Sequence, residues 1–449
     1  MRKFFGTDGI RGVAGVSPLD PESLVRLGKA IATVFLKRGG KHRVLIGKDT
    51  RLSGYMIETS LSAGITACGA DLMLVGPLPT PGVAYLTKSM RADAGIVVSA
   101  SHNSFEDNGI KIFGADGFKL ADSIEQELEG LMQPGVLDHK VATPDSFGKA
   151  VRINDAVGRY TVFLKSCFPR ELSLAGLKIG VDCAHGASYV VAPQTFSELG
   201  AEVTSRGISP NGRNINAGLG SMHPEAIAKV VEESGLDIGI AFDGDADRLM
   251  LIDEKGAIHD GDSILLVCAL DLKNRGKLRT PQVVGTVMSN LGLERALNSA
   301  GITLLRSAVG DRYVLEEMTR SGAQIGSEQS GHCIFSDLSS TGDGILSALQ
   351  VLAVMGRTGK KLSELTANFS RYPQQIINVA VKRKIPFTEV PRLEQAISSA
   401  QSALGTKGRI LVRYSGTELK VRVMVESEDS VTCLTHVNEV ADVVRAELS

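Results

Sequence analysis

The stretch Ile238-Gly239-Ile240-Ala241-Phe242-Asp243-Gly244-Asp245-Ala246-Asp247-Arg248 is an apolar strand that runs into an acidic loop. At about 4 Å and an effective dielectric constant near 20, each pair of its carboxylates repels by about 4 kcal/mol, a cost that a divalent cation removes. A calcium EF-hand is excluded, because Arg248 stands at the sixth loop position, which needs glycine, and Leu249–Ile252 predicts a strand rather than a helix. The pattern favours Mg²⁺ bound jointly with a phosphate that Arg248 also faces. A solvated acidic turn remains the alternative for this loop taken alone.

The strand before the acidic loop is the third strand of a pattern that occurs three times. In each copy a strand is followed by a helix that ends at a glycine, a second strand, a second helix and a third strand. Such alternation predicts α/β domains with mixed, mostly parallel sheets. The first strands are expected at 44–46, 178–181 and 282–285, the glycines are Gly69, Gly200 and Gly301, the second strands begin at Asp71, Glu202 and Thr303, and the third strands are 94–98, 238–241 and 323–326.

A polar loop follows each third strand. The loops are Ser99-Ala100-Ser101-His102-Asn103, Asp243 to Arg248, and Ser327-Glu328-Gln329-Ser330-Gly331-His332. In sheets of this kind ligands bind beyond the carboxyl ends of the strands. Three equivalent loops therefore predict three similar α/β domains arranged around a central cleft.

The last part of the chain has a different pattern, which predicts a smaller C-terminal α+β domain. Strands are expected near 376–381, 409–413 and 421–425, and helices at 394–404 and from residue 430. The expected domains are 1–150, 151–256, 257–370 and 371–449, with linkers around 144–155 and 369–375. At the other end of the chain, Asp20 and Pro21 predict the start of a helix that ends at Gly39-Gly40.

The composition excludes several classes of protein. The 449 residues correspond to about three domains of roughly 150 residues. With 49 basic and 50 acidic residues the net charge is −1, which argues against nucleic acid as a partner. Apolar stretches such as 264–270 are far shorter than the roughly 18–20 residues of a membrane span, and no signal peptide is visible. Six scattered cysteines predict reduced, buried thiols, so we expect a cytoplasmic protein with no membrane partner.

The loop that follows the strand at 94–98 places Ser101 next to His102. A Ser–His hydrolase is disfavoured, because adjacent residues on an extended chain point in opposite directions and His102 is then badly placed as a base for Ser101. No GxSxG motif accompanies the pair. Taken alone, Ser101 is an ordinary loop hydroxyl. Its equivalence to the acidic loop suggests instead that a phosphate on Ser101 supplies an oxygen to the metal.

Two further groups could bind a phosphorylated sugar. The turn Arg413-Tyr414-Ser415-Gly416-Thr417, with Arg422 on the next strand, offers guanidiniums, hydroxyls and turn amides to a phosphate dianion. The loop around Glu328 offers carboxylate, amide and hydroxyl groups that suit sugar hydroxyls. In isolation each group is equally an ordinary polar turn. No Walker A or GxGxxG sequence indicates nucleotide chemistry.

In their order along the chain these motifs, together with Gly6-Thr7-Asp8-Gly9-Ile10-Arg11-Gly12, resemble the signatures of the α-D-phosphohexomutase superfamily. The resemblance covers the full chain. It implies an isomerase that moves a phosphoryl group within a sugar phosphate through a phosphoserine and a 1,6-bisphosphate intermediate. The first residues and the Glu-Gln-Ser-Gly-His loop favour interconversion of glucosamine 6-phosphate and glucosamine 1-phosphate, a step toward UDP-N-acetylglucosamine and cell-wall synthesis. A phosphomannomutase or phosphoglucomutase of the same superfamily is the alternative.

The resemblance also implies residue roles. Ser101 would carry the phosphoryl group, Lys111 would be the general acid/base, Arg248 would stabilise the transferring group, and Arg11 and His332 would support the reacting hydroxyl. Cationic neighbours are expected to lower the pKa of Lys111. One Mg²⁺ per chain would be held by phosphorylated Ser101 with Asp243, Asp245 and Asp247. The substrate would be bound by Glu328, Ser330, Arg413, Ser415, Gly416, Thr417 and Arg422.

Two positions depart from the superfamily pattern. Ser104 and Leu419 stand where proline is expected, which predicts changed loop stiffness rather than lost chemistry. From other classes, a metal-dependent phosphatase would release inorganic phosphate without isomerisation. A non-catalytic sugar-phosphate sensor is disfavoured, because it would have no need of Ser101, the three aspartates and Lys111. A homodimer is compatible with the resemblance.

Overall fold

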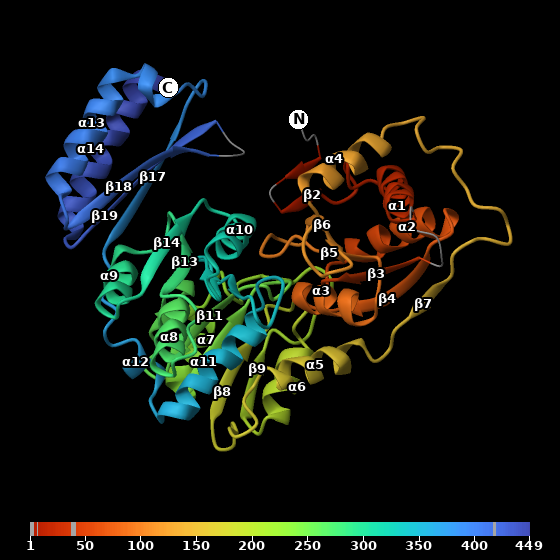
Figure 1. Cartoon of the computed structure of the whole chain (residues 1–449), viewed down its shortest axis with the longest axis horizontal. Coiled ribbons are helices and arrows are strands. Elements are labelled where there is room, and N and C mark those ends of the chain that lie inside the picture. Colours follow the sequence, from red (N-terminus) through yellow and green to blue (C-terminus); the bar gives the residue numbers. More distant parts are fainter. Residues whose placement is uncertain (1–3, 7, 37–41, 416–418) are drawn as a thin grey trace.

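Four β-sheets, each built from a consecutive part of the chain, organise the computed structural model, which describes residues 4–6, 8–36, 42–415 and 419–449 (Figure 1). In spatial order the first sheet has β1 (Phe5–Gly6), β2 (Gly9–Val13), β6 (Asp107–Gly114), β5 (Ala94–Val98), β3 (Arg43–Lys48), β4 (Asp71–Pro77) and β7 (Ala150–Arg152). The second has β12 (Ile258–His259), β11 (Leu249–Asp253), β10 (Ile238–Phe242), β8 (Lys178–Asp182) and β9 (Glu202–Arg206). The third has β14 (Thr303–Ser307), β13 (Gln282–Thr286), β15 (Ile325–Ser327) and β16 (Cys333–Phe335), and the fourth has β17 (Gln374–Ala380), β19 (Lys420–Ser427) and β18 (Gly408–Tyr414).

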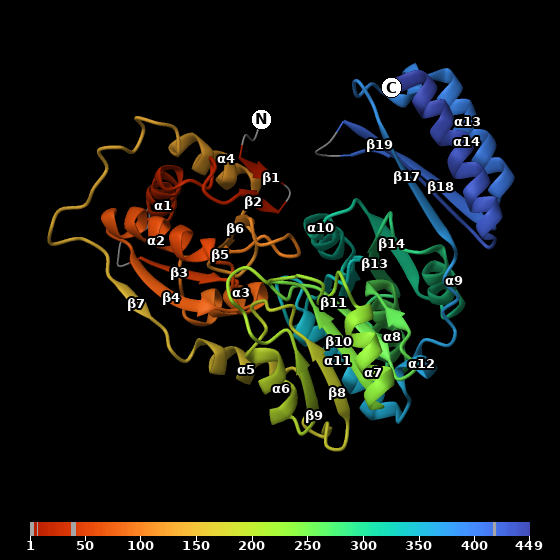
Figure 2. The ribbon, with the colours of Figure 1, turned by 180° about the vertical axis from the view of Figure 1, so that it is seen from behind.

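Helices cover these sheets. The first sheet is accompanied by α1 (Pro21–Phe35), α2 (Ser53–Ala67), α3 (Thr80–Ser89) and α4 (Asp122–Leu131), and the second by α5 (Ala156–Ser166), α6 (Val191–Glu198) and α7 (Glu225–Ser234). The third is accompanied by α8 (Gly261–Asn274), α9 (Leu291–Ser299), α10 (Asp311–Ser321), α11 (Gly344–Thr358) and α12 (Leu362–Leu365). The fourth sheet carries α13 (Pro391–Leu404) and α14 (Ser430–Leu448) on one face, after a 3₁₀ turn at Phe387–Glu389 (Figures 1 and 2).

The threefold strand pattern predicted from the sequence is confirmed. In each of the first three sheets three strands run parallel, in the orders β4-β3-β5, β9-β8-β10 and β14-β13-β15. The glycines expected after the helices, Gly69, Gly200 and Gly301, have φ of 94°, 104° and 64°, a left-handed conformation that favours glycine. A fourth strand then returns antiparallel to the third, as β6, β11 or β16, and makes each sheet mixed.

Residues 144–155, expected to be a linker, contain β7, which pairs parallel with β4 at the edge of the first sheet. Helix α1 begins as predicted, because the Asp20 carboxylate accepts the Ser23 N–H at 2.9 Å and Pro21 occupies the first turn. It ends at Phe35, and the Gly39-Gly40 stop lies outside the described residues.

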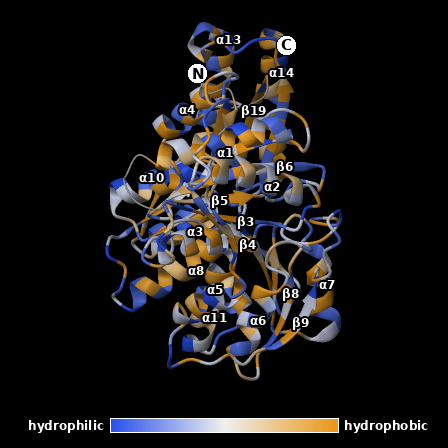
Figure 3. Cartoon of the chain, turned by 90° about the vertical axis from the view of Figure 1, so that its right-hand side faces the viewer, coloured by the Kyte–Doolittle hydropathy of each residue, from blue (hydrophilic) through white to orange (hydrophobic). Residues whose placement is uncertain are grey.

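One apolar core runs through the first three units, where each unit is a sheet with its helices, and further apolar clusters lie within single units. The fourth unit has a core of its own. The core that spans three units runs from Leu45 through Phe242 to Leu352. Hydrophobic residues along β3, β4 and β5 (Figure 3) supply this core, for example through Leu45, and also a second core within the first unit, for example through Val44. The buried residues described in the core of the fourth unit run from Val379 to Leu448, and the partly buried Ile377 packs against them. All six cysteines are unpaired and five of them are buried, as the sequence predicted. Among the described residues no helix has the length and apolar character that a membrane crossing requires.

Candidate active site

Three loops at the carboxyl ends of β5, β10 and β15 meet, as the sequence predicted. We call residues 99–106 the serine loop, residues 243–248 the aspartate loop and residues 327–332 the glutamate loop. Ser101 Oγ donates to Asp243 Oδ2 at 2.6 Å, which joins the first two loops. His332 Nδ1 lies 3.7 Å from Asp247 Oδ1, which joins the second and third. Side chains from three units therefore face one another.

Ser101 has a left-handed backbone, with φ of 54°, and is almost fully buried. A non-glycine residue in this region is strained and persists only when its surroundings hold it there. Its N–H donates to Ser99 Oγ at 2.9 Å. The extended chain assumed in the sequence argument is wrong here, because the turn brings His102 Nδ1 to 3.3 Å from the Ser101 hydroxyl. That hydroxyl nevertheless makes its shorter hydrogen bond to Asp243.

The carboxylates of Asp243, Asp245 and Asp247 form a buried cluster with ligand oxygens all within 4.8 Å of one another. Burial, followed by the charges of Asp247 and Asp245, raises the pKa of Asp243 well above its usual value. The Oδ1 atoms of Asp245 and Asp247 are buried without a hydrogen-bond partner. Unsatisfied hard oxygen donors at this spacing, with a serine oxygen beside them, fit Mg²⁺.

The ammonium group of Lys111, on β6, lies among three carboxylates. Its Nζ is 2.9 Å from Asp245, 3.0 Å from Asp247 and 3.3 Å from Asp8. Burial favours the neutral amine, but these carboxylates outweigh it and raise the pKa of Lys111 well above its usual value. The expectation that cationic neighbours lower this pKa is wrong, because the nearest charges are anionic and Arg11 opposes them only weakly.

A second ion cluster borders the site and was not assigned from the sequence. Lys119 Nζ contacts Asp8 Oδ1 and Asp311 Oδ2, both at 2.5 Å, and so links the first unit to the third. Asp8 lies between β1 and β2, and Asp311 is the first residue of α10. Both stand in stretches of the sequence that contain Gly and Arg, 6–12 and 310–313. Lys119 stands in no recognisable motif, so only the folded chain could identify it.

The cationic residues expected to support catalysis lie around the aspartate loop. Arg11 Nη1 donates to the carbonyl oxygen of Ala100 at 3.1 Å, beside Ser101. Arg248 Nε is 3.8 Å from Asp247 Oδ1. Burial opposes the charge of Arg248, but Asp247 and Asp243 outweigh it and raise its pKa. Burial likewise disfavours the charged form of His332, but Asp247 and Asp311 outweigh it and raise the pKa of His332.

The glutamate loop is held tightly against the aspartate loop. Gly331 has φ of 86°, and a Cβ there would lie 1.9 Å from the carbonyl oxygen of Leu249, so only glycine fits. Glu328 is buried and accepts the N–H of Gly310 at 3.0 Å. Ser330 Oγ is buried without a hydrogen-bond partner. Both polar groups therefore border the site, and the Ser330 hydroxyl is available to a ligand.

The group expected to bind the second phosphate lies on the fourth unit. Arg413 on β18 and Arg422 on β19 are opposite one another in the sheet, and burial followed by the charge of Arg422 lowers the pKa of Arg413. Ser415 is buried, whereas Gly416 and Thr417 lie outside the described residues. Among the described contacts none joins this group to the serine or aspartate loop. Leu419, beside this turn, is 55 % exposed.

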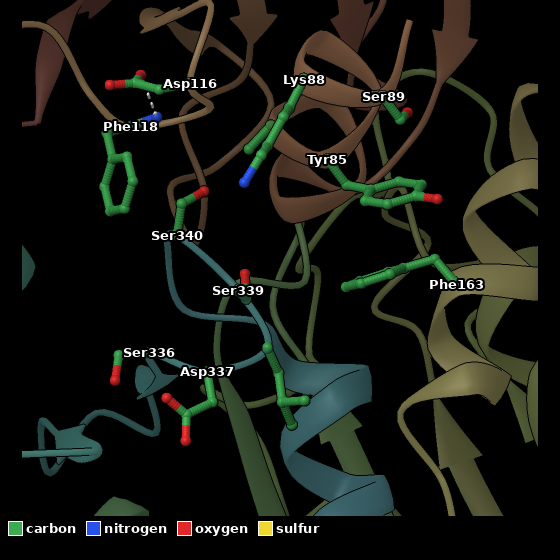
Figure 4. A pocket seen from close by; sticks show the side chains of 12 residues that line it. Tyr85, Lys88, Ser89, Asp116, Phe118, Phe163, Ser336, Asp337, Ser339 and Ser340 are labelled. Carbon is green, nitrogen blue, oxygen red and sulfur yellow. Dashed lines mark hydrogen bonds between the residues drawn. The ribbon is translucent and has the colours of Figure 1, made fainter.

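A separate cavity of about 340 Å³ lies between α3, α5 and residues 336–340 (Figure 4). Figure 4 shows Tyr85 and Phe163 side by side on one wall, and their stacked rings are 4.1 Å apart. Ser340 Oγ donates to the carbonyl oxygen of Gly117 at 2.6 Å. None of the described residues that line this cavity is an expected site residue.

Four family models match the chain in the order of its sheets. They are described as phosphoglucomutase/phosphomannomutase α/β/α domain I over residues 2–135, domain II over 159–256, domain III over 260–372 and the C-terminal domain over 376–443. A phosphoglucomutase/phosphomannomutase family protein of Burkholderia thailandensis shares the fold, with a TM-score of 0.81, 24% identity and 98% and 97% of the two chains covered. Fold and site thus define a member of the α-D-phosphohexomutase superfamily, as the sequence motifs predicted.

Closer relatives identify the branch. A phosphoglucosamine mutase of Syntrophotalea carbinolica is 53% identical over 448 residues, covering 100% of this chain and 98% of the relative. One of Myxococcus xanthus is 52% identical over 450 residues, with 100% and 98% covered. The chain therefore belongs to the phosphoglucosamine mutase family, a family of isomerases that use Mg²⁺. An N-acetylphosphoglucosamine mutase of Aspergillus fumigatus, solved with GlcNAc-6P and magnesium, shares the fold at a TM-score of 0.71 and 18% identity, with 100% of this chain and 96% of that chain covered.

Proposed function

We propose that this chain interconverts glucosamine 6-phosphate and glucosamine 1-phosphate, with Ser101 as the phosphoryl carrier. The observation that carries the proposal is the 2.6 Å hydrogen bond from Ser101 Oγ to Asp243, at the edge of a cluster of three buried carboxylates. A serine oxygen held against such a cluster is suited to a phosphate that shares the metal with the protein. The names of the relatives support glucosamine as the sugar.

In the proposed reaction the phosphoryl group leaves Ser101 Oγ and bonds to the free hydroxyl of the substrate, giving the 1,6-bisphosphate. The sugar hydroxyl loses a proton and Ser101 Oγ gains one. The bisphosphate then turns around, and Ser101 takes back the other phosphoryl group. Held by Asp243, Asp245, Asp247 and the phosphorylated serine, Mg²⁺ would stabilise negative charge on the transferring group.

The cationic residues have distinct parts in this proposal. Arg248 stabilises the negative charge that develops on the transferring oxygens, as phosphoryl transfer requires. Lys111 starts as the protonated group, since its carboxylate neighbours raise its pKa, so it is suited first to give a proton to the departing Ser101 oxygen. Arg11 and His332 orient the reacting hydroxyl.

The remaining residues bind the substrate. Glu328 and Ser330 receive the sugar hydroxyls. Arg413, Ser415, Gly416, Thr417 and Arg422 hold the phosphate that does not react. Because this group belongs to the fourth unit, substrate is bound between the fourth unit and the other three.

The proposal extends to the organisation of the enzyme. We place domains at 1–150, 151–256, 257–370 and 371–449, supported by the third and fourth sheets, whose strands all lie within the last two ranges. Strands β7 and β12 extend the first and second sheets two or three residues past the first two boundaries. Ser104 and Leu419, which stand where the superfamily pattern has proline, are proposed to change the stiffness of their loops and to leave the chemistry intact. We also propose that the enzyme is a cytoplasmic homodimer whose product is used for UDP-N-acetylglucosamine and cell-wall synthesis. Light scattering tests the dimer, and cell fractionation tests the location.

The decisive experiment compares Ser101→Ala with Ser104→Ala, since Ser104 is an exposed serine in the same loop. Intact-mass measurement and peptide mapping locate any phosphate, and a coupled assay measures isomerisation of glucosamine, glucose and mannose 6-phosphates. We expect one phosphate on Ser101, inactive Ser101→Ala, active Ser104→Ala, and the highest kcat/KM with glucosamine 6-phosphate. An active Ser101→Ala protein contradicts the mechanism. A preference for another sugar indicates a phosphomannomutase or phosphoglucomutase activity.

A further inference from the structure

The carbonyl oxygens of Ser101 and Asn103 each accept hydrogen bonds from the same two side chains, Arg51 and Asn216. Arg51 Nη2 donates to them at 3.0 and 2.8 Å. Asn216 Nδ2 donates to them at 2.9 and 2.9 Å. Arg51 follows β3 in the first unit, whereas Asn216 lies between β9 and α7 in the second. The serine loop is thus held by two units at the same pair of oxygens.

Two of these hydrogen bonds are made to the backbone of Ser101, the residue proposed to react. Ser101 has φ of 54°, its carbonyl oxygen accepts from Arg51 and Asn216, and its hydroxyl donates to Asp243 at 2.6 Å. A Cβ on Gly244 would lie 2.5 Å from the Ser101 carbonyl oxygen and 3.0 Å from Asn216 Nδ2. The serine loop, the aspartate loop and the segment between β9 and α7 that carries Asn216 therefore meet at the carbonyl oxygen of Ser101.

The two donors differ in how they are themselves held. Arg51 is fully buried, and its Nε donates to Asp49 Oδ2 at 2.8 Å. Asn216 is half-buried, has φ of 60°, and its N–H donates to the carbonyl oxygen of Ala184 at 2.9 Å. Asparagine tolerates this left-handed conformation better than most residues do. Arg51 belongs to the core of the first unit, so Asn216 is the donor that depends on contact between the two units.

We propose that Asn216, together with Arg51, is a positioning residue that keeps the Ser101 hydroxyl aligned with the aspartate loop through both half-reactions. The inference rests on the proposed function, in which Ser101 carries the phosphoryl group. Without the Asn216 side chain, the serine loop moves relative to the three aspartates. The sugar hydroxyl, the phosphorus and Ser101 Oγ are then less often aligned for in-line transfer. Transfer to water then competes: the water oxygen forms the new bond to phosphorus, the bond to Ser101 Oγ breaks, and one water proton ends on that oxygen.

The test uses Asn216→Gly, which removes the side chain and still allows a positive φ, and Asn216→Asp, which keeps the size of the side chain but replaces the donor by an acceptor. The control is Asn214→Ala in the same loop. Asn214 hydrogen-bonds only within that loop in the described contacts, through Ser209 and Asn211 at 3.1 and 2.9 Å. It therefore reports general loosening of the loop.

For both Asn216 variants we expect kcat to fall by about 10-fold or more while KM for glucosamine 6-phosphate stays within about twofold, because the sugar and distal phosphate are bound elsewhere. Inorganic phosphate released per isomerisation rises, and hydrogen–deuterium exchange accelerates in peptides that cover residues 99–107. Asn214→Ala changes none of these quantities.

Unchanged exchange at 99–107 with unchanged kcat in the Asn216 variants overturns the inference, and so does an equal effect in Asn214→Ala. Ser101→Ala is measured in parallel to distinguish failure of the proposed function from failure of the positioning role of Asn216. If Ser101→Ala is active, the proposed function itself fails. If Ser101→Ala is inactive and Asn216→Gly behaves as the unaltered enzyme, only the positioning role fails.

Discussion

Lys111 and Asp245 form a fully buried ion pair, 2.9 Å from ammonium nitrogen to carboxylate oxygen, between the first and second units. The same ammonium also lies 3.0 Å from Asp247 and 3.3 Å from Asp8. Removing one partner of a buried pair leaves charges without compensation, which usually costs about 3–5 kcal/mol. The pair therefore contributes to the cohesion of the units as well as to the site.

Replacement of Lys111 by methionine is expected to lower stability in metal-free buffer by about 3–5 kcal/mol, because Asp245 and Asp247 lose their nearest cation and Asp8 keeps only Arg11 and Lys119. Urea denaturation monitored by circular dichroism measures the change. The control is Lys229→Met, which removes an exposed lysine 3.7 Å from Glu233 and should cost no more than about 1 kcal/mol. Equal effects of the two substitutions would contradict the assignment of Lys111 as the compensating charge.

Asp243→Asn is expected to raise the melting temperature in EDTA and to abolish most of the increase that Mg²⁺ produces. In the metal-free protein, burial and two neighbouring aspartates disfavour the Asp243 carboxylate, as its raised pKa indicates. An asparagine still accepts the Ser101 hydrogen bond without adding charge. A gain of about 1 kcal/mol corresponds to about 2–4 °C, measurable by differential scanning fluorimetry with and without Mg²⁺.

The control for this prediction is Asp442→Asn, at an aspartate whose side chain is 71 % exposed. It should leave the Mg²⁺-induced shift unchanged. A full Mg²⁺ response in Asp243→Asn would show that the aspartate loop is not the principal metal site.

Much of this fold could be predicted from the sequence because local signals marked it repeatedly. The left-handed positions at Gly69, Gly200 and Gly301 end each helix, and the next strand begins two residues later in every copy. The polar loops after the third strands stand where parallel sheets place ligands. Periodicity and turn chemistry are properties of neighbouring residues, so a single sequence displays them.

Properties that depend on distant residues could not be predicted in the same way. The pKa of Lys111 was predicted in the wrong direction because Asp245 and Asp247 follow it by more than 130 positions. Ser101 was assigned to an extended chain because a positive φ on a serine has no local signal. Lys119 was missed because its carboxylate partners, Asp8 and Asp311, stand 111 and 192 positions away along the chain.

Asp262 is expected to make stability depend on pH. Burial, then the charge of Asp260, raises its pKa from 3.8 to about 7. Since the folded protein holds this proton more tightly than the unfolded chain, the resulting stability falls as pH rises from about 4 through 7. In Asp262→Asn this loss disappears, and the side-chain oxygen still accepts the Asn290 N–H that Asp262 accepts at 2.8 Å. The melting-temperature difference between Asp262→Asn and the unaltered protein should therefore grow between pH 4 and 8, whereas a constant difference would contradict the prediction.

Arg413→Met is expected to raise KM for glucosamine 6-phosphate by about 10- to 100-fold, because a hydrogen bond to a charged group contributes about 1.5–3 kcal/mol. Burial and the neighbouring charge of Arg422 disfavour the Arg413 cation, and a bound phosphate dianion relieves that repulsion. The phosphate content of Ser101 in the purified protein should stay unchanged, since no described contact joins Arg413 to the serine loop. Arg392→Met, at an arginine whose side chain is 80 % exposed, is the control and should leave KM unchanged. Steady-state kinetics with the 1,6-bisphosphate saturating decides the matter: an unaltered KM in Arg413→Met would remove this arginine from the substrate site.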